Sequence, residues 1–147
     1  MLNIENRTTL DINSNLLDKI AHRLTKKEID LTICDNALIQ EYNHQYRGID
    51  RATDVLSFPI HDNFDYTPLG SIVISANFVK EKSELLSHSY DDELCLLFIH
   101  GLLHLLGYDH EVDNGEMRKE EERLIGEFNL PKSLIVRVEN FNKQKGK

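Results

Sequence analysis

One stretch decides the fold: His100-Gly-Leu-Leu-His104-Leu-Leu-Gly107-Tyr-Asp-His110. His100 and His104 are four positions apart, so on a helix their side chains project from one face, about 40° from each other. Gly107 predicts the end of that helix, because glycine adopts the left-handed conformation common there without strain. The reversed chain can then carry His110 back towards the pair, which brings three imidazoles to one point.

Three converging imidazoles predict a catalytic metal site. A zinc ion that takes part in chemistry is usually held by three protein ligands and an open fourth position, whereas structural zinc has four protein ligands. A single histidine in an apolar stretch is more often a core residue than a ligand. Three at this spacing, with a glycine between them, favour one bound zinc ion. Cys95 is a poor fourth ligand, because it lies about 140° around the helix from His100.

Gly101 separates this stretch from the zinc peptidases that share its ligand spacing. Their pattern is H-E-x-x-H-x-x-G-x-x-H, in which the glutamate takes a proton from the zinc-bound water. Gly101 cannot accept a proton, so either another element supplies the base or the reaction uses hydroxide already formed on the metal, whose water can have a pKa of about 7. A zinc peptidase is therefore only a third hypothesis.

Length and composition indicate a single soluble domain over residues 1–147. The longest apolar stretch, residues 94–106, is too short to span a bilayer, and no secretory leader pattern is present, so we expect a cytoplasmic protein. Cys34 and Cys95 are expected to be buried thiols. The net charge of −8 argues against indiscriminate nucleic-acid binding but leaves room for a local basic groove, and residues 132–147 are basic.

Periodicity and capping residues predict alternating strands and helices. Ile29, Leu31 and Ile33 alternate with polar residues, which is typical of a strand with one exposed face. The expected elements are a strand at 2–6, a helix from Asp11 or Asn13 to about Thr25, a strand at 29–33, a helix from Asp35 to about Tyr46, strands at 55–58 and 69–74 paired as a hairpin, a helix from Ser75 to about His88, the helix with the histidines, a helix from Asp113 or Asn114 through Phe128, and a short element at 134–138.

The helix that carries His100 and His104 should be the central buried one. From Leu94 onward its sequence is apolar nearly all round. Asp91 and Asp92 fall in its first turn, where negative charge is favourable against the helix dipole. Burial would exclude water from all but the open metal position and would make removal of the ion costly.

Arg47 is the candidate catalytic residue outside the histidine stretch. A guanidinium can hold two phosphate oxygens at once and keeps its charge, which suits stabilisation of a phosphoryl transition state. An arginine after a helix is more often only a surface residue. His44 and His61 are expected to be solvent-exposed rather than ligands. Pro59 cannot donate to a strand ladder, so the strand before it should end there or lie at a sheet edge.

Three motifs together resemble the YbeY family of bacterial endoribonucleases, also described as ribosomal-RNA maturation factors. They are Tyr46-Arg47-Gly48, Thr53-Asp-Val-Leu-Ser-Phe-Pro59 and, most specifically, the run from His100 to His110 with glycine in place of the peptidase glutamate. The resemblance implies an α+β fold, a small mixed four-stranded sheet packed with about five helices around a zincin-like central metal-binding helix. It also implies one zinc ion at His100, His104 and His110 and a contribution of Arg47 to activity.

The resemblance further implies hydrolysis of single-stranded RNA in small-subunit ribosomal RNA maturation and ribosome quality control, with the small subunit or assembly factors as partners and no membrane. The attacking group would be hydroxide on zinc or an activated ribose 2′-OH. Ser71 stands where the family usually has aspartate, so no role is assigned to it. The leading hypothesis is a zinc-dependent endoribonuclease. The alternative is a ribosome-assembly RNA-binding factor whose zinc is mainly structural, which the charge and the missing base favour.

Overall fold

A mixed sheet and five helices make up the part of the chain that the structure, a computed structural model, describes: residues 1–61, 64 and 66–131. The strands are β1 (Leu2–Asn6), β2 (Ile29–Cys34), β3 (Val55–Pro59) and β4 (Gly70–Ser75). The helices are α1 (Ser14–Leu24), α2 (Asn36–Arg47), α3 (Ala76–Leu86), α4 (Tyr90–Leu105) and α5 (Glu116–Glu127). The predicted α+β class with a four-stranded mixed sheet is confirmed.

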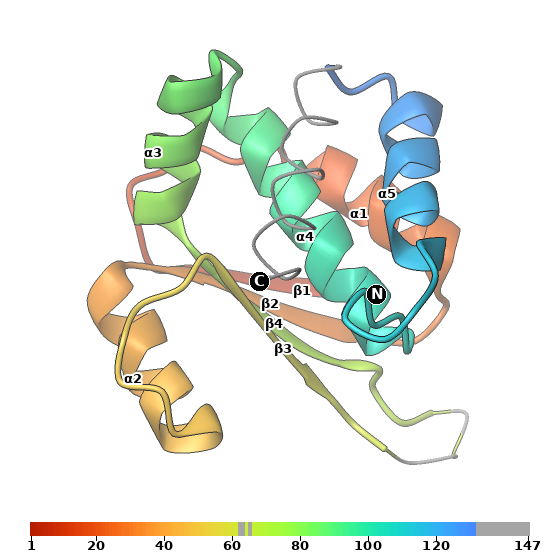
Figure 1. Ribbon diagram of the computed structural model, residues 1–147, viewed down its shortest axis with the longest axis horizontal. Helices are drawn as coiled ribbons and strands as arrows, with labels where there is room; N and C mark the ends of the chain where they lie inside the picture. Colours follow the sequence, from red (N-terminus) through yellow and green to blue (C-terminus); the bar gives the residue numbers. More distant parts are fainter. Residues whose placement is uncertain (62–63, 65, 132–147) are drawn as a thin grey trace.

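The sheet has the strand order β1-β2-β4-β3, with β3 at one edge. β1, β2 and β4 run parallel, whereas β3 pairs with β4 in the antiparallel direction. β3 ends at Pro59, opposite Gly70, so the expected hairpin and edge position are both present. Figure 1 shows α2 on one face of the sheet and α1, α3, α4 and α5 on the other.

α4 is the centre of the larger hydrophobic core. Every residue from Glu93 to Leu103 is buried, and the helix packs against both hairpin strands and against α1, α3 and α5. The Ser89 side chain accepts the N–H of Asp92, and the acidic residues predicted for the first turn lie there. The expected central buried helix is thereby confirmed.

A second, smaller cluster packs α2 against the opposite face of the sheet. Its buried members are Cys34, Ile39, Leu56 and Val73.

Both cysteines are buried, and burial raises the pKa of Cys34 to about 11 and that of Cys95 to about 12. Among the described residues, no helix is long and apolar enough to cross a membrane.

Two helix ends differ slightly from those expected. α3 ends at Leu86 because Ser87 turns left-handed, with φ of 58°. α5 begins at Glu116 rather than at residue 113 or 114, because the Asp113 carboxylate accepts the N–H groups of Gly115 and Met117 from outside the helix. The predicted short element at 134–138 and the basic stretch 132–147 lie outside the described residues.

Gly70 provides a first test of the packing between the hairpin and α4. Its φ is +155°, and a Cβ there would lie 2.5 Å from the Phe58 carbonyl oxygen and 2.8 Å from Leu105 Cδ2. We expect Gly70→Ala to lower the free energy of unfolding by about 2 kcal/mol, as overpacking does. Urea unfolding measures the change. Gly126→Ala is the control: a Cβ there meets nothing within 4 Å among the described residues, so the same substitution in α5 should stabilise by up to about 1 kcal/mol.

Candidate metal centre

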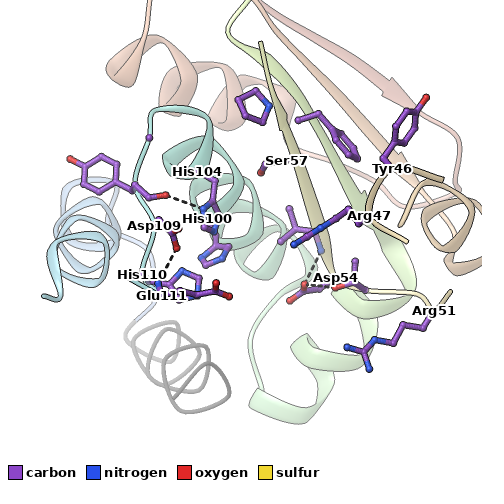
Figure 2. Close-up of a pocket in the computed structure, with 16 residues that line it drawn as sticks. Tyr46, Arg47, Arg51, Asp54, Ser57, His100, His104, Asp109, His110 and Glu111 are labelled. Carbon is purple, nitrogen blue, oxygen red and sulfur yellow. Dashed lines mark hydrogen bonds between the residues drawn. The ribbon is translucent and has the colours of Figure 1, made fainter. Parts of the chain in front are cut away.

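Three histidine side chains meet beside the end of α4. His100 and His104 come from the helix and His110 from the loop that follows it, and their ligand atoms all lie within 4.8 Å of one another. The ring centroids are 4.8 Å apart for the helical pair, and the ring of His110 lies 5.2 and 5.3 Å from the other two. Figure 2 shows the rings gathered on one side of a cleft. This group could hold a metal ion.

The turn after α4 brings His110 back to the helix. Gly107 has a φ of +100°, a conformation that side-chain-bearing residues rarely adopt. Its N–H donates to the carbonyl of His104, and the Tyr108 N–H donates to the carbonyl of Leu103. These bonds close the helix end and reverse the chain, as the position of the glycine predicts.

Hydrogen bonds from the Nδ1 atoms leave the opposite ring nitrogens available to bind a metal. His104 Nδ1 lies 3.0 Å from the Tyr108 carbonyl oxygen. A carbonyl only accepts, so this nitrogen carries the proton and Nε2 keeps its lone pair. His100 Nδ1 lies 3.1 Å from Glu121 Oε1, and His110 Nδ1 lies 3.4 Å from the sulfur of Met117. Ligand histidines in metal sites commonly donate their other N–H in this way, so these residues fit a bound ion.

Glu121 is the candidate site residue that the sequence interpretation missed. It lies in α5, is 2% exposed, and its Oε2 has no hydrogen-bond partner within the described part of the chain. A buried carboxylate is costly unless charge or hydrogen bonds compensate it. A cation held by the imidazoles would provide such compensation. The signal was available, because Glu121 shares the inner face of α5 with Met117, Leu124 and Ile125.

The pKa of His104 is lowered to about 4, first because burial disfavours the charged ring and then because His100 and His110 are close. In the unfolded chain the pKa of the same ring would lie near the ordinary histidine value of 6.5. The metal-free protein is therefore expected to lose stability as the pH falls from about 6.5 towards 4, because the unfolded state then binds the extra proton. Urea unfolding at pH 7 and 5.5 measures this loss.

The matched controls for this pH effect are two histidine-to-asparagine variants. His104→Asn should reduce the change in stability between the two pH values, since it removes the perturbed group. His44→Asn should leave the change as it is in the wild type, because His44 is exposed. An equal loss of the free energy of unfolding between pH 7 and pH 5.5 in the wild type and in His104→Asn would contradict the prediction.

The histidines open into a cleft of about 780 Å³. Arg47, the last residue of α2, lines the same cleft, and Figure 2 shows its side chain extending towards the histidines. Arg51 adds a second positive charge, while Asp54, Asp109 and Glu111 add negative ones. His44 and His61 are exposed, as expected. Within the described part of the chain, Ser71 is not among the lining residues.

A glutamate at position 101, as in zinc peptidases, would be crowded against the hairpin. A Cβ there would lie 3.0 Å from Ile72 Cγ2, 3.1 Å from Ser57 Oγ and 3.2 Å from Val55 Cγ2. The Ser57 hydroxyl also donates to the Gly101 carbonyl at 2.9 Å. The helix thus contacts the hairpin through this glycine, and a longer side chain would require these neighbours or α4 to shift.

Fold and site together define a class: an α+β domain in which a buried helix and its following turn present three histidines to a cleft, without the peptidase glutamate. The model of the family described as Endoribonuclease YbeY matches residues 2–129. The chain belongs to this family, and the resemblance inferred from its motifs is confirmed.

Relatives match along nearly their whole length. The Endoribonuclease YbeY of Sulfurimonas denitrificans is 56% identical over 139 residues, which cover 95% of this chain and 99% of the relative. That of Campylobacter jejuni (strain RM1221) is 52% identical over 128 residues, 87% of this chain and 95% of the relative. A protein of Thermotoga maritima, known from a solution structure, has 28% identity and a TM-score of 0.59, with 90% and 95% of the two chains covered.

Proposed function

We propose that this protein is a zinc-dependent endoribonuclease that cleaves single-stranded RNA during maturation of small-subunit ribosomal RNA and in ribosome quality control. Residues 1–147 act as one hydrolase domain in the cytoplasm, with the small ribosomal subunit or its assembly factors as partners. One zinc ion is bound by His100, His104 and His110, and Arg47 contributes to catalysis. Membership of a family named for endoribonuclease activity supports the reaction class.

The observation that carries this proposal is the meeting of three histidines and an arginine in one open cleft. Zinc bound there would act as a Lewis acid towards a phosphate oxygen. Arg47 would hold phosphate oxygens and offset the negative charge that builds on phosphorus, because its guanidinium is always protonated. The Nδ1 partners keep the imidazole rings in the orientation that binding requires.

A cleavage assay with metal analysis tests the proposal. The purified protein should contain about one zinc per chain by mass spectrometry and should cut a labelled single-stranded RNA. Arg47→Ala should lower the rate by about 10²-fold or more while zinc content stays the same. Arg7→Ala is the control, since Arg7 is exposed and pairs with Glu5. Intact RNA after incubation with the zinc-loaded wild type would overturn the proposal.

The ends of the cleaved RNA identify the attacking group. A 2′,3′-cyclic phosphate would show that the ribose 2′-OH attacks first, and its absence from the earliest products would favour water. This assay separates two reactions that the same four side chains could support.

The second candidate is a ribosome-assembly RNA-binding factor with a mainly structural zinc. The acidic residues in the cleft, the net charge of −8 and the glycine at position 101 favour it. It predicts that zinc removal lowers the melting temperature but leaves RNA binding unchanged after refolding with an inert metal, and that no cleavage occurs. The endoribonuclease proposal predicts cleavage that disappears with the zinc.

A further inference from the structure

The cleft crosses the edge strand β3 from one face of the sheet to the other. Ser57 points to the α4 face, where its hydroxyl donates to the Gly101 carbonyl. Phe58, the next residue, packs on the opposite face with the α2 cluster. Both residues line the cleft, so the cleft extends from the histidines over the edge of the sheet to the end of α2.

Tyr46 lies at the α2 end of this cleft and is held in place while its surface stays exposed. Its ring contacts the Phe58 ring edge-on, with centroids 5.4 Å apart, and stacks near Tyr42 at 6.2 Å. Tyr46 is nevertheless 60% exposed. The two ring contacts restrict its orientation without covering it, so little further ordering would be needed for a planar group to stack on it.

Arg47 follows Tyr46 directly in the chain, and both line the cleft. In the view of Figure 2, Arg47 lies between Tyr46 and the histidines. Proteins that bind single-stranded nucleic acid combine such cations, which follow the phosphates, with aromatic rings on which bases stack. A base in a duplex is already stacked on its neighbours, so only an unpaired one is available to such a ring.

We propose that Tyr46, supported by Phe58, is a stacking site for one unpaired nucleobase of the RNA, next to the phosphate that Arg47 contacts. The site rests on the proposed endoribonuclease function and adds to it a physical reason for preferring single strands. It takes any base, because every base offers a planar face, so it selects strand state rather than sequence.

Steady-state cleavage of a short single-stranded RNA by the zinc-loaded, full-length protein tests the site. Tyr46→Leu keeps apolar cover over Phe58 but removes the ring, and we expect it to raise KM about tenfold with a much smaller change in kcat. Tyr46→Phe keeps the ring and should retain most of the affinity. Tyr90→Leu is the matched control, because Tyr90 opens α4 and does not line the cleft.

A set of substrates, each with one abasic nucleotide, locates the base. For the wild type, one abasic position near the cut should raise KM by about the same factor as Tyr46→Leu. With the RNA that is abasic at that position, Tyr46→Leu should not raise KM further, since the two changes remove the same contact. If the leucine variant folds poorly, the abasic scan of the wild type and the KM of Tyr46→Phe still test the site.

Two outcomes distinguish failure of the stacking site from failure of the proposed endoribonuclease function. If the wild type cleaves RNA but no abasic position couples to Tyr46, or Tyr46→Leu matches Tyr90→Leu, the stacking site is wrong and the endoribonuclease function stands. If the zinc-loaded wild type leaves every RNA intact, the proposed function itself fails.

Discussion

Replacing His104 with alanine is expected to abolish retention of zinc and to lower RNA cleavage by at least about 10³-fold, more than the 10–100-fold that loss of an outer-shell partner costs. His104 is one of the three histidines whose ligand atoms converge in the described part of the chain. With two imidazoles left, neither the geometry nor the affinity for the ion is maintained. Mass spectrometry of the purified protein and an RNA cleavage assay measure the two losses.

His44→Ala is the control for this prediction. His44 is exposed on α2, and its removal should leave zinc content and cleavage within about twofold of the wild type, as for surface changes generally. The far-ultraviolet circular dichroism of His104→Ala should show that the helices persist at low temperature. A His104→Ala variant that binds zinc and cuts RNA as the wild type does would contradict the assignment of the metal site.

The course of α4 and its turn could be predicted because the decisive contacts are local. The spacing of His100 and His104 follows from helix geometry, and Gly107 marks the turn through its own backbone preference. Residues 94–105 are apolar nearly all round, and the structure buries all of them except His104. The strand edge at Pro59 follows in the same way from one missing N–H. The cell location, the zinc and the role of Arg47 stay predictions.

Contacts between distant segments could not be predicted with the same rules. Glu121 meets His100 across 21 residues of sequence, and only the packing of α5 on α4 brings them together. The narrow contact of Gly101 with Val55 and Ser57 also depends on the sheet being in place. The contacts of Asp113 are different, because they are local. Its carboxylate accepts the N–H groups of Gly115 and Met117 from three residues before the observed first helical residue, Glu116, and helix-end patterns place such starts only to within one or two residues.

Glu121→Gln is expected to weaken zinc binding between about 10- and 100-fold, the usual effect of changing a partner of a ligand histidine. The amide oxygen can still accept the Nδ1–H of His100, but the negative charge of the carboxylate beside the bound ion is lost. Competition with a fluorescent zinc chelator measures the affinity. Glu122→Gln is the control on the same helix, because Glu122 pairs with Arg118 at the surface and should keep the wild-type affinity.

The stability of the same variant separates a role in metal binding from a merely structural one. Without metal, Glu121 is a buried carboxylate whose Oε2 has no hydrogen-bond partner among the described residues, so the neutral glutamine should leave the melting temperature unchanged or raise it. With zinc, the melting temperature should rise less than in the wild type, because the stabilisation that a ligand provides follows its affinity. A structural role would lower both melting temperatures equally and leave the zinc-induced rise intact. A carboxylate that acts through His100 on the ion therefore predicts two results together: a melting temperature that is unchanged or raised without metal, and a smaller rise when zinc is added.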